Sequence, residues 1–493
     1  MPYIISIDQS TSCTKALLFD SSGNLAGRTD LPHRQLVDGR GWVEHDLEEI
    51  YGNLIKSVRM LLEKTGVSDR EIAGAALSNQ RETSVAWHRG TGKPVYNAIV
   101  WQCGRGAAIC SRIKQSNPEN AELIKSRTGL NLSPYFSAAK LAWILENVPE
   151  AKRLALQGNL VCSTMDSWLV YRLTKEHAVK TDYSNASRTQ LFNIYALKWD
   201  SDICGMFGIP PAALPEVCPS DSLFGSTDFD GVLDNPVPLH GVLGDSQGAL
   251  FAQGCLTGGM VKATYGTGSS VMMNTGDNPV ACKGLVTSLA WGMGKDISYV
   301  LEGNINYTGA TIEWLKNDLQ LIGSAAETEP ISQRAAAVPG LYLVPAFSGL
   351  GAPYWNENAR TVICGIDRTT GKAEIVRAAE ESIAYQIADI VLLMKEQTGF
   401  SLSTLRVDGG PTRDAFLMQF QADIVRAGVR VAAVEELSGM GPAVAAGSAL
   451  GVYDTDSILN KPPKKEFAPK MTEQQRIKLY AGWKRAVNFA LTY

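Results

Sequence analysis

Short apolar runs interrupted by polar, glycine- or serine-rich turns are the clearest pattern in this chain. Near the start, the apolar run 3–7 leads into the polar turn 8–15, and past the middle the turn 265–270 leads into the apolar run 271–273. Each pattern predicts a strand, a tight turn and a second strand. Taken alone, each is an ordinary hairpin. Taken together, their small residues and hydroxyls suggest two related halves whose backbone N–H groups hold one polyphosphate.

Helical periodicity and a buried strand complete the first half. Apolar residues recur at helical spacing from the N-cap candidate Asp46 as far as Leu62. The stretch 72–77 predicts a buried strand that delivers the polar segment 78–83 at its carboxyl end, where ligands sit in α/β sheets. Amphipathic helices are expected over 138–147 and 165–173. The stretch 210–238 is rich in Pro, Gly and Asp, so we expect it to run over the surface.

The second half is predicted to repeat the order of elements seen in the first. We expect it to start with the strand 241–245, which ends in Asp245 and precedes a helix over 247–254. Later elements are predicted as a helix over 375–397, a strand over 405–410 and a helix over 414–427. The glycine pair 409–410 permits close approach of a ligand to the backbone, with a plain turn as the alternative. A boundary near residue 250 gives the predicted domains 1–250 and 251–493.

Composition narrows the class of protein. A chain of 493 residues is too long for a single core, and 19% charged residues with a net charge of −4 are ordinary for an enzyme. Scattered Lys and Arg exclude a basic nucleic-acid groove, and no apolar run reaches the roughly 18 residues of a membrane-spanning helix. The nine cysteines form no CxxC pair and the five histidines stand apart. We therefore expect reduced thiols in a cytoplasmic protein and no zinc site.

Longer segments resemble the FGGY family of carbohydrate kinases. The likeness runs from residue 3 to residue 483 and is carried by 41–46, 79–83, 92–103, 135–147, 181–189, 349–355, 365–381 and 406–410. It implies an α/β, actin-like ATPase fold with two ribonuclease-H-like domains flanking a cleft. It also implies transfer of the γ-phosphoryl group of ATP, with Mg²⁺, to a polyol or sugar hydroxyl. The likeness is greatest to members that phosphorylate glycerol, so glycerol 3-phosphate is the expected product.

The resemblance assigns the central acids. Asp245 matches the catalytic base of the family, and Asp8 matches the acid that, together with Asp245, holds Mg²⁺ directly or through water. A carboxylate at a strand end can accept a hydrogen bond from the attacking hydroxyl and take its proton as the new P–O bond forms. Capping the following helix is the alternative role for Asp245.

The resemblance also implies a nucleotide site that both domains supply. Positions on the two phosphate turns and around the nucleoside are matched by Thr11, Ser12, Cys13, Lys15, Thr267, Gly268, Gly309, Glu313, Gly410 and Asp414. In this family the first domain carries the acceptor site and the first phosphate turn, and the second domain binds the nucleotide. Glu313 and Asp414 are acids where amides are common, and Lys15 stands where Arg is common.

The acceptor site is implied in the first domain and at its border with the second. Its matched positions are Arg81, Glu82, Trp101, Tyr135, Asp245, Ser246 and Ser270. Arg81 and Glu82 supply donors and acceptors for hydroxyls, whereas the two aromatic rings offer apolar faces to the C–H side of a polyol. Without the family, Arg81 and Glu82 would be interpreted as a surface ion pair.

Two serines depart from the pattern of the glycerol-phosphorylating members. Ser246 stands where Gln is usual, and Ser270 stands where Phe is usual. Both changes widen the pocket, so a larger polyol or a ketose (a tetritol, pentitol or pentulose) is the alternative acceptor. A non-catalytic nucleotide-binding regulator is a third hypothesis, against which the retained base argues. The family resemblance implies a homodimer or homotetramer. From the composition we expect no nucleic-acid partner and no insertion into a membrane.

Overall fold

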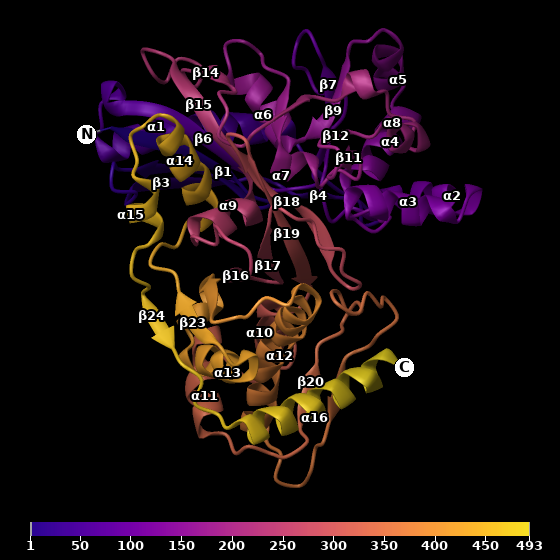
Figure 1. Ribbon diagram of the computed structural model, residues 1–493, viewed down its shortest axis with the longest axis vertical. Helices are drawn as coiled ribbons and strands as arrows, with labels where there is room; N and C mark the ends of the chain where they lie inside the picture. Colours follow the sequence, from indigo (N-terminus) through magenta and orange to yellow (C-terminus); the bar gives the residue numbers. More distant parts are fainter. Residues whose placement is uncertain (1, 493) are drawn as a thin grey trace.

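The computed structural model describes residues 2–492 and contains two large mixed sheets (Figure 1). The first sheet has the strand order β14-β15-β6-β1-β2-β3. Its strands are β1 (Tyr3–Gln9), β2 (Cys13–Phe19), β3 (Leu25–Pro32), β6 (Ile72–Asn79), β14 (Gly225–Thr227) and β15 (Val237–Gly244). β1, β2 and β3 form an antiparallel meander, and β6 and β15 continue the sheet in parallel with β1.

The second sheet repeats this plan in the order β18-β19-β17-β16-β22-β23-β24. Its strands are β16 (Val261–Tyr265), β17 (Ser269–Gly276), β18 (Val286–Met293), β19 (Asp296–Ile305), β22 (Thr404–Asp408), β23 (Gly428–Val431) and β24 (Lys465–Phe467). β16, β17 and β19 pair antiparallel, whereas β22 and β23 run parallel to β16. A meander followed by parallel strands, twice in one chain, confirms the predicted fold class of two ribonuclease-H-like halves.

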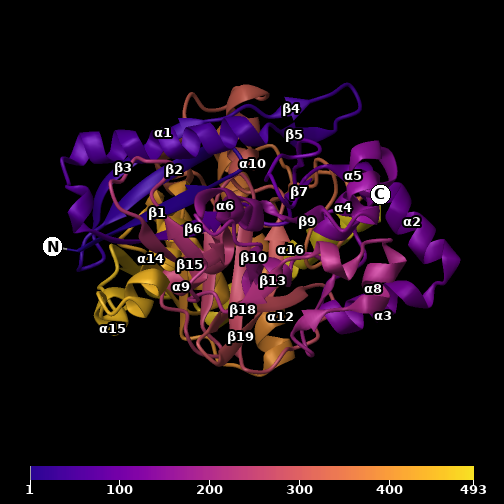
Figure 2. The ribbon, with the colours of Figure 1, turned by 90° about the horizontal axis from the view of Figure 1, so that it is seen from above.

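Helices cover both faces of the first sheet because its strands are apolar on both sides. Ile5 and Ile7 share a core with helix α1 (Leu47–Thr65), whereas the intervening strand face, with Ile4, shares a core with α14 (Leu437–Ala449). This alternation follows from the two-residue period of a strand. α14 comes from the far end of the chain, yet it packs beside α9 (Asp245–Ala252) on β6 and β15 (Figures 1 and 2).

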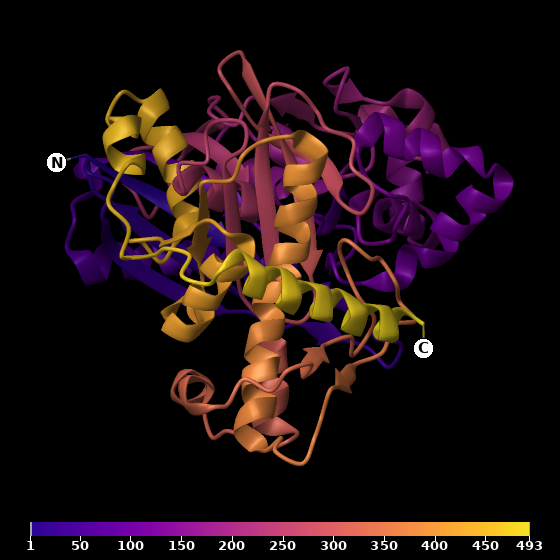
Figure 3. The same ribbon diagram turned by 60° about the horizontal axis from the view of Figure 1, so that its bottom comes forward.

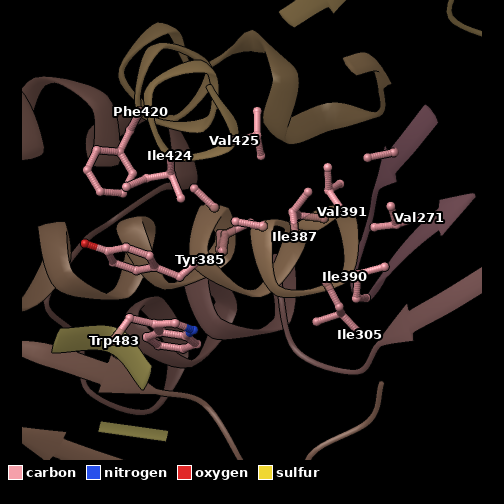
Figure 4. Packing of buried hydrophobic residues seen from close by; sticks show 14 of the residues in the cluster. Val271, Ile305, Tyr385, Ile387, Ile390, Val391, Phe420, Ile424, Val425 and Trp483 are labelled. Carbon is pink, nitrogen blue, oxygen red and sulfur yellow. The ribbon is translucent and has the colours of Figure 1, made fainter. Parts of the chain in front are cut away.

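The second sheet packs against the long helix α12 (Lys372–Thr398). In Figure 4 Tyr385, Ile387 and Ile390 of α12 pack between the sheet and Phe420 of α13 (Ala415–Val425). Further helices of this half are α10 (Gly309–Asn317), α11 (Thr328–Arg334) and α16 (Glu473–Leu491). Figure 3 shows α16 lying across α12, and Asp389 of α12 fixes it there by accepting hydrogen bonds from Tyr480 and Trp483 of α16.

A third sheet is inserted between the elements of the first half, in the order β4-β5-β8-β7-β9. Its strands are β4 (Leu36–Val37), β5 (Val43–His45), β7 (Ser84–His88), β8 (Ala98–Ile99) and β9 (Leu160–Thr164). Helices packed around it are α2 (Ala107–Ser116), α3 (Glu119–Thr128), α4 (Ser137–Asn147), α5 (Pro149–Leu156) and α8 (Ser201–Met206). Residues 80–83 join β6 to β7, so they lie at the junction of two sheets.

The structure confirms most predicted elements and corrects two. The predicted helices correspond to α1, α4, α6 (Met165–Leu173), α9, α12 and α13. The stretch 210–238 is not a surface segment: it supplies edge strand β14, and the side chains of Phe224 and Phe229 are fully buried in it. Residues 241–245 do not begin the second sheet. They follow the chain through the end of β15, the last strand of the first sheet in chain order, because β15 pairs with β6. Within residues 2–492 no helix has the length and apolar character needed to cross a bilayer.

Candidate active site

Asp245 and Arg81 meet at the carboxyl end of the first sheet. Asp245 directly follows β15, and Arg81 lies just beyond β6, the neighbouring parallel strand, so both side chains leave the same edge. Nε of Arg81 lies 3.1 Å from Oδ1 of Asp245, and the backbone N–H of Ser246 donates to the same oxygen at 2.6 Å. The Asp245 side chain keeps 36% of its surface exposed, which leaves the carboxylate open to a ligand.

The surroundings of Asp245 raise the pKa of its carboxyl. Desolvation raises the pKa of this carboxyl above its ordinary value, the Asp8 carboxylate acts in the same direction, and Arg81 opposes both. A base is most efficient when its pKa approaches the working pH, so this shift suits a carboxylate that takes a proton.

A buried ionic network lies behind this pair, and two of its members were not predicted from the sequence. Arg81 donates to both oxygens of Glu302, from Nη1 at 2.9 Å and from Nη2 at 2.7 Å. Nη1 of Arg188 lies 2.8 Å from Oε2 of Glu302, and Nε of Arg188 donates to Oε1 of Glu82 at 2.5 Å. Glu302 lies on β19 of the second sheet, so this network joins the two sheets through charged groups.

The network holds Glu302 as an anion. Burial alone would raise the pKa of its carboxyl, but the guanidinium groups of Arg188 and Arg81 hold that pKa well below its usual range. In the sequence, Glu302 could have been noticed because it is an acid inside the apolar run of β19. Arg188 stands inside the segment 181–189, which carried the family resemblance, although no role was assigned to it.

Aromatic side chains form one wall beside Arg81 and Glu82. The rings of Trp101 and Tyr135 meet edge to face with centroids 5.6 Å apart. Nε1 of Trp101 donates to the Thr11 hydroxyl at 2.9 Å, which links this wall to the first phosphate turn. Burial and the charge of Glu82 raise the pKa of Tyr135, which keeps its phenol protonated.

The two serines of the predicted pocket differ in their contacts. Both are half-buried. Ser270 donates to Oε1 of Glu302 at 3.3 Å, so its hydroxyl is attached to the ionic network. Ser246 contributes the backbone N–H that holds Asp245. Neither residue offers a large side chain to the site.

The first phosphate turn joins β1 to β2, and Asp8 lies on β1 just before it. Asp8 is 3% exposed, and its Oδ2 accepts from Lys15 at 3.2 Å, while Lys15 also donates to Glu436 at 2.8 Å. Burial raises the pKa of Asp8, and Lys15 opposes this shift. The second carboxylate oxygen of Asp8, Oδ1, is buried and accepts no hydrogen bond within residues 2–492. On the turn itself Ser12 is exposed and Cys13 is half-buried.

The unpartnered oxygen of Asp8 fits a hydrated Mg²⁺. In the part of the chain that the structure describes, no three His, Cys, Asp or Glu side chains gather into a complete metal site. Mg²⁺ keeps several waters and is commonly held by one or two carboxylates together with substrate phosphates. Asp8 and Asp245, which lie close enough for the charge of Asp8 to raise the pKa of Asp245, match that donor set.

The second phosphate turn packs on the start of α10. The backbone N–H of Gly309 donates to the carbonyl of Gly266 at 2.9 Å, and Thr267 is exposed at the tip of the turn. A Cβ atom on Gly268 would lie 2.4 Å from the carbonyl oxygen of Ile305. Only glycine therefore fits this position without moving the backbone.

A pocket of about 560 Å³ opens next to the second phosphate turn. Among its lining residues are the predicted nucleotide positions Thr267, Gly309, Glu313, Gly410 and Asp414. Glu313 is exposed at its edge, whereas Asp414 caps α13 by accepting from the N–H of Leu417 at 3.0 Å. Glu380 of α12 also lines the pocket and was not predicted. The pocket has the volume of a small-molecule site.

The glycine pair that leads from β22 toward α13 borders this pocket. Gly409 has φ of +100°, and a Cβ atom there would lie 1.9 Å from the carbonyl oxygen of Tyr265. The close packing of Gly409 brings the backbone of Gly410 to the pocket beside the second phosphate turn. The contact with Tyr265 explains why position 409 requires glycine, and close approach of a ligand to this backbone stays a prediction.

Known proteins resemble this chain along its whole length. The FGGY family of carbohydrate kinases matches through its N-terminal domain at residues 3–252 and through its C-terminal domain at residues 261–450. Glycerol kinase 1 of Thermotoga maritima is 47% identical over 493 residues, covering 99% of this chain and 100% of that protein. Glycerol kinase of Carboxydothermus hydrogenoformans is 45% identical over 491 residues, covering 99% and 98%.

A solved structure agrees with these sequence matches. The structure of Plasmodium falciparum glycerol kinase with ADP superimposes with a TM-score of 0.93 at 35% identity, covering 100% of this chain and 98% of that one. Both domain matches and the end-to-end relatives lead to one conclusion: the chain belongs to the FGGY family of carbohydrate kinases.

Proposed function

We propose that this chain transfers the γ-phosphoryl group of ATP to a primary hydroxyl of glycerol and releases ADP and glycerol 3-phosphate. The observation that carries the proposal is the open Asp245 carboxylate, held by Arg81 at the carboxyl end of the first sheet. Relatives named glycerol kinase, 42–47% identical over the full chain, support glycerol as the acceptor.

The acceptor site binds a small polyol through hydrogen bonds and one apolar wall. Glu82 accepts from hydroxyl groups and Arg81 donates to them, while Trp101 and Tyr135 cover the C–H side. Because Arg188 and Glu302 already satisfy part of the charge of Glu82 and Arg81, these side chains are held in place before the polyol arrives. A site built to hydrogen-bond hydroxyls rejects analogues that lack them.

Asp245 removes the proton of the hydroxyl that reacts. The hydroxyl oxygen forms a bond to the γ-phosphorus, the bond between that phosphorus and the β–γ bridging oxygen breaks, and ADP leaves with the electron pair. The hydroxyl proton passes to the Asp245 carboxylate. Little covalent chemistry falls to the protein in phosphoryl transfer, so positioning and charge neutralisation account for most of the acceleration.

The nucleotide lies across the two phosphate turns with its nucleoside in the 560 Å³ pocket. Backbone N–H groups and hydroxyls of Thr11, Ser12, Cys13, Thr267 and Gly268 hold the phosphates, and Gly309, Glu313, Gly410 and Asp414 surround the nucleoside. Lys15 orients Asp8 and adds positive charge beside the first turn. Mg²⁺ bound at Asp8 and Asp245 together with the nucleotide supplies neutralisation of the phosphate charge.

We further propose that the protein works in the cytoplasm and assembles as a homodimer or homotetramer. Nine cysteines that are all free thiols support a reducing compartment. The family resemblance supports the oligomer. Light scattering coupled to gel filtration measures the oligomeric state directly, and a monomeric mass contradicts that part of the proposal.

A coupled ADP-release assay tests the function. MgATP is supplied with glycerol, erythritol, threitol, the pentitols, dihydroxyacetone, xylulose and ribulose in turn. The highest kcat/KM for glycerol supports the proposal. A four- or five-carbon acceptor that exceeds glycerol by about tenfold, or about 1.4 kcal/mol of transition-state preference, contradicts it. That outcome supports the second candidate, a kinase of a larger polyol or ketose, which the small side chains of Ser246 and Ser270 favour.

A further inference from the structure

The segment 80–83, which carries Arg81 and Glu82, is closed on itself by the side chains at its two ends. The hydroxyl of Thr83 donates a hydrogen bond to Oε1 of Gln80 at 2.8 Å. Between them Glu82 has φ of +60°, a conformation that is uncommon for residues other than glycine and persists only where surrounding contacts hold it. Gln80 and Thr83 are 1% and 0% exposed, so water does not compete for their hydrogen bond. These two side chains therefore hold the backbone that presents Arg81 and Glu82.

Gln80 attaches this segment to the first phosphate turn. Its backbone N–H donates to the carbonyl of Gln9 at 2.7 Å, and its Nε2 donates to Oε1 of Gln9 at 3.1 Å. The same Nε2 lies 3.4 Å from the carbonyl oxygen of Ser10 and 3.2 Å from Nδ1 of His45. Since Oε1 of Gln80 accepts from Thr83, both polar atoms of this side chain are used within the protein. Gln80 thus connects protein groups and keeps no polar atom free for a ligand.

Trp101 connects the same segment to the turn a second time. Its backbone N–H donates to the hydroxyl of Thr83 at 3.2 Å, and Nε1 of its indole donates to the hydroxyl of Thr11 at 2.9 Å. The Thr83 hydroxyl therefore accepts one hydrogen bond and donates its only proton to another. The result is a closed hydrogen-bond chain of Gln9, Gln80, Thr83, Trp101 and Thr11. It fixes the segment to the phosphate turn at two points.

We propose that Gln80 and Thr83 are positioning residues that set the place of the acceptor hydroxyl relative to the γ-phosphate. They act on the polyol through Arg81, Glu82 and Trp101, and on the nucleotide through the turn. Positioning of this kind governs rate steeply, because a displacement of about 1 Å between reacting groups can cost about 100-fold. The inference rests on the proposed function, because it takes Arg81 and Glu82 to hold a polyol and the turn to hold phosphates.

Turnover per nucleotide-binding site tests the inference. Thr83→Val keeps the shape of the side chain and removes the hydroxyl, so it breaks the hydrogen-bond chain on both sides of this residue. Calorimetry counts the ADP-binding sites, and the ADP-release assay gives kcat at a saturating concentration of the best acceptor in the panel. We expect kcat per site to fall by about tenfold or more, while KM for ATP stays within about threefold. A merely structural loss lowers the number of sites and leaves kcat per site unchanged.

Two further variants of the hydrogen-bond chain complete the test. Thr83→Ser keeps the hydroxyl, and we expect its kcat per site to stay within about threefold of the wild type. Trp101→Phe keeps an aromatic ring and removes the indole N–H that reaches Thr11, so kcat per site is expected to fall in this variant as well. Trp101→Phe answers the question if Thr83→Val does not fold.

Thr174→Val is the matched control. Thr174 is another buried threonine, and it lies at the end of α6. Its hydroxyl also donates once, to the carbonyl of Val170 at 2.8 Å, and accepts once, from the N–H of Ala178 at 3.0 Å. We expect Thr174→Val to keep the kcat per site of the wild type, because this hydroxyl has no part in the hydrogen-bond chain.

The outcomes separate this inference from the proposed function. A kcat per site in Thr83→Val equal to that of the wild type overturns the inference and leaves the proposed phosphorylation standing. An equally large fall in Thr83→Ser or in Thr174→Val also overturns it. A larger acceptor that exceeds glycerol in the panel changes the proposed acceptor and not this inference, since Arg81 and Glu82 are held in the same way for either polyol. A wild-type chain that phosphorylates no acceptor overturns both.

Discussion

Arg81 and Glu302 join the two sheets through two parallel hydrogen bonds, at 2.9 Å and 2.7 Å, and the remaining nitrogen of the same guanidinium, Nε, holds Asp245 at 3.1 Å. A bidentate pair fixes the plane of both groups. Glu302 therefore sets the orientation of Arg81 and, through it, the position of the Asp245 carboxylate. A strand of the second sheet thus orients a carboxylate attached to the first.

Glu302→Gln is expected to lower both turnover and stability. The substitution keeps the shape but leaves Arg81 and Arg188 as buried charges that lack their shared anion, and breaking a buried pair in this way costs about 3–5 kcal/mol. Urea unfolding measures the change in the free energy of unfolding, and ADP release measures kcat. Glu466→Gln, which removes the surface partner of Arg430, is the control and leaves both values near those of the wild type. Equal effects of the two variants would contradict the role assigned to Glu302.

Asp245→Asn is expected to abolish most turnover while nucleotide binding persists. The amide keeps the size of the side chain and loses the ability to accept a proton, and a general base contributes about 10²- to 10⁴-fold to the rate. Steady-state assays give kcat, and calorimetry gives the ADP dissociation constant, which we expect to stay within about twofold of the wild type. A chain that acts as a nucleotide-dependent regulator would show no turnover to lose.

Ser270→Phe is expected to narrow the acceptor site. The large ring fills space beside Glu302, where Ser270 now donates a hydrogen bond. We expect kcat/KM for erythritol to fall relative to that for glycerol by about tenfold or more, since pocket contacts of this size discriminate by roughly 1–3 kcal/mol. Ser270→Ala removes the hydroxyl without filling the pocket and serves as the control. An erythritol-to-glycerol ratio that is unchanged in Ser270→Phe would show that this position does not limit acceptor size.

The raised pKa of Glu380 predicts that stability declines as the pH rises. The pKa is about 10 in the folded chain, through burial and Asp414, against an ordinary value of about 4.3 when unfolded. Between these values the folded chain keeps a proton that the unfolded chain has lost, so this group favours folding below the unfolded pKa and loses that contribution as the pH rises toward 10.

Glu380→Gln is expected to remove this dependence. The slope for one full proton is at most about 1.4 kcal/mol per pH unit. We expect Tm of the wild type to fall more steeply than Tm of the variant between about pH 6 and pH 9, as measured by differential scanning calorimetry. Parallel curves for the two proteins would mean that Glu380 is ionised in the folded chain.

Local sequence patterns determined the strands, the two turns and the acids that stand beside them. The hairpins at 8–15 and 265–270 and the strand that leads to Asp245 follow from short apolar runs, N-cap residues and glycines, which act within a few residues. The family resemblance supplied candidate roles, and the structure gathers those positions at one edge of each sheet. The stretch 210–238 was misjudged because Pro and Gly mark turns but do not tell whether Phe224 and Phe229 between them are buried.

Tertiary structure alone decided which distant side chains face one another. The pairing of Arg81 with Glu302 spans 221 positions, and Glu380 of α12 lies near enough to Asp414, the N-cap of α13, for the charge of Asp414 to raise its pKa. No periodicity connects such residues, because the packing of sheets and helices decides which polar side chain becomes the partner of each. By sequence alone Glu380 is another acid of a long helix. Burial beside a second carboxyl raises its pKa at the wall of the 560 Å³ pocket, because desolvation and charge repulsion act only once the chain has folded.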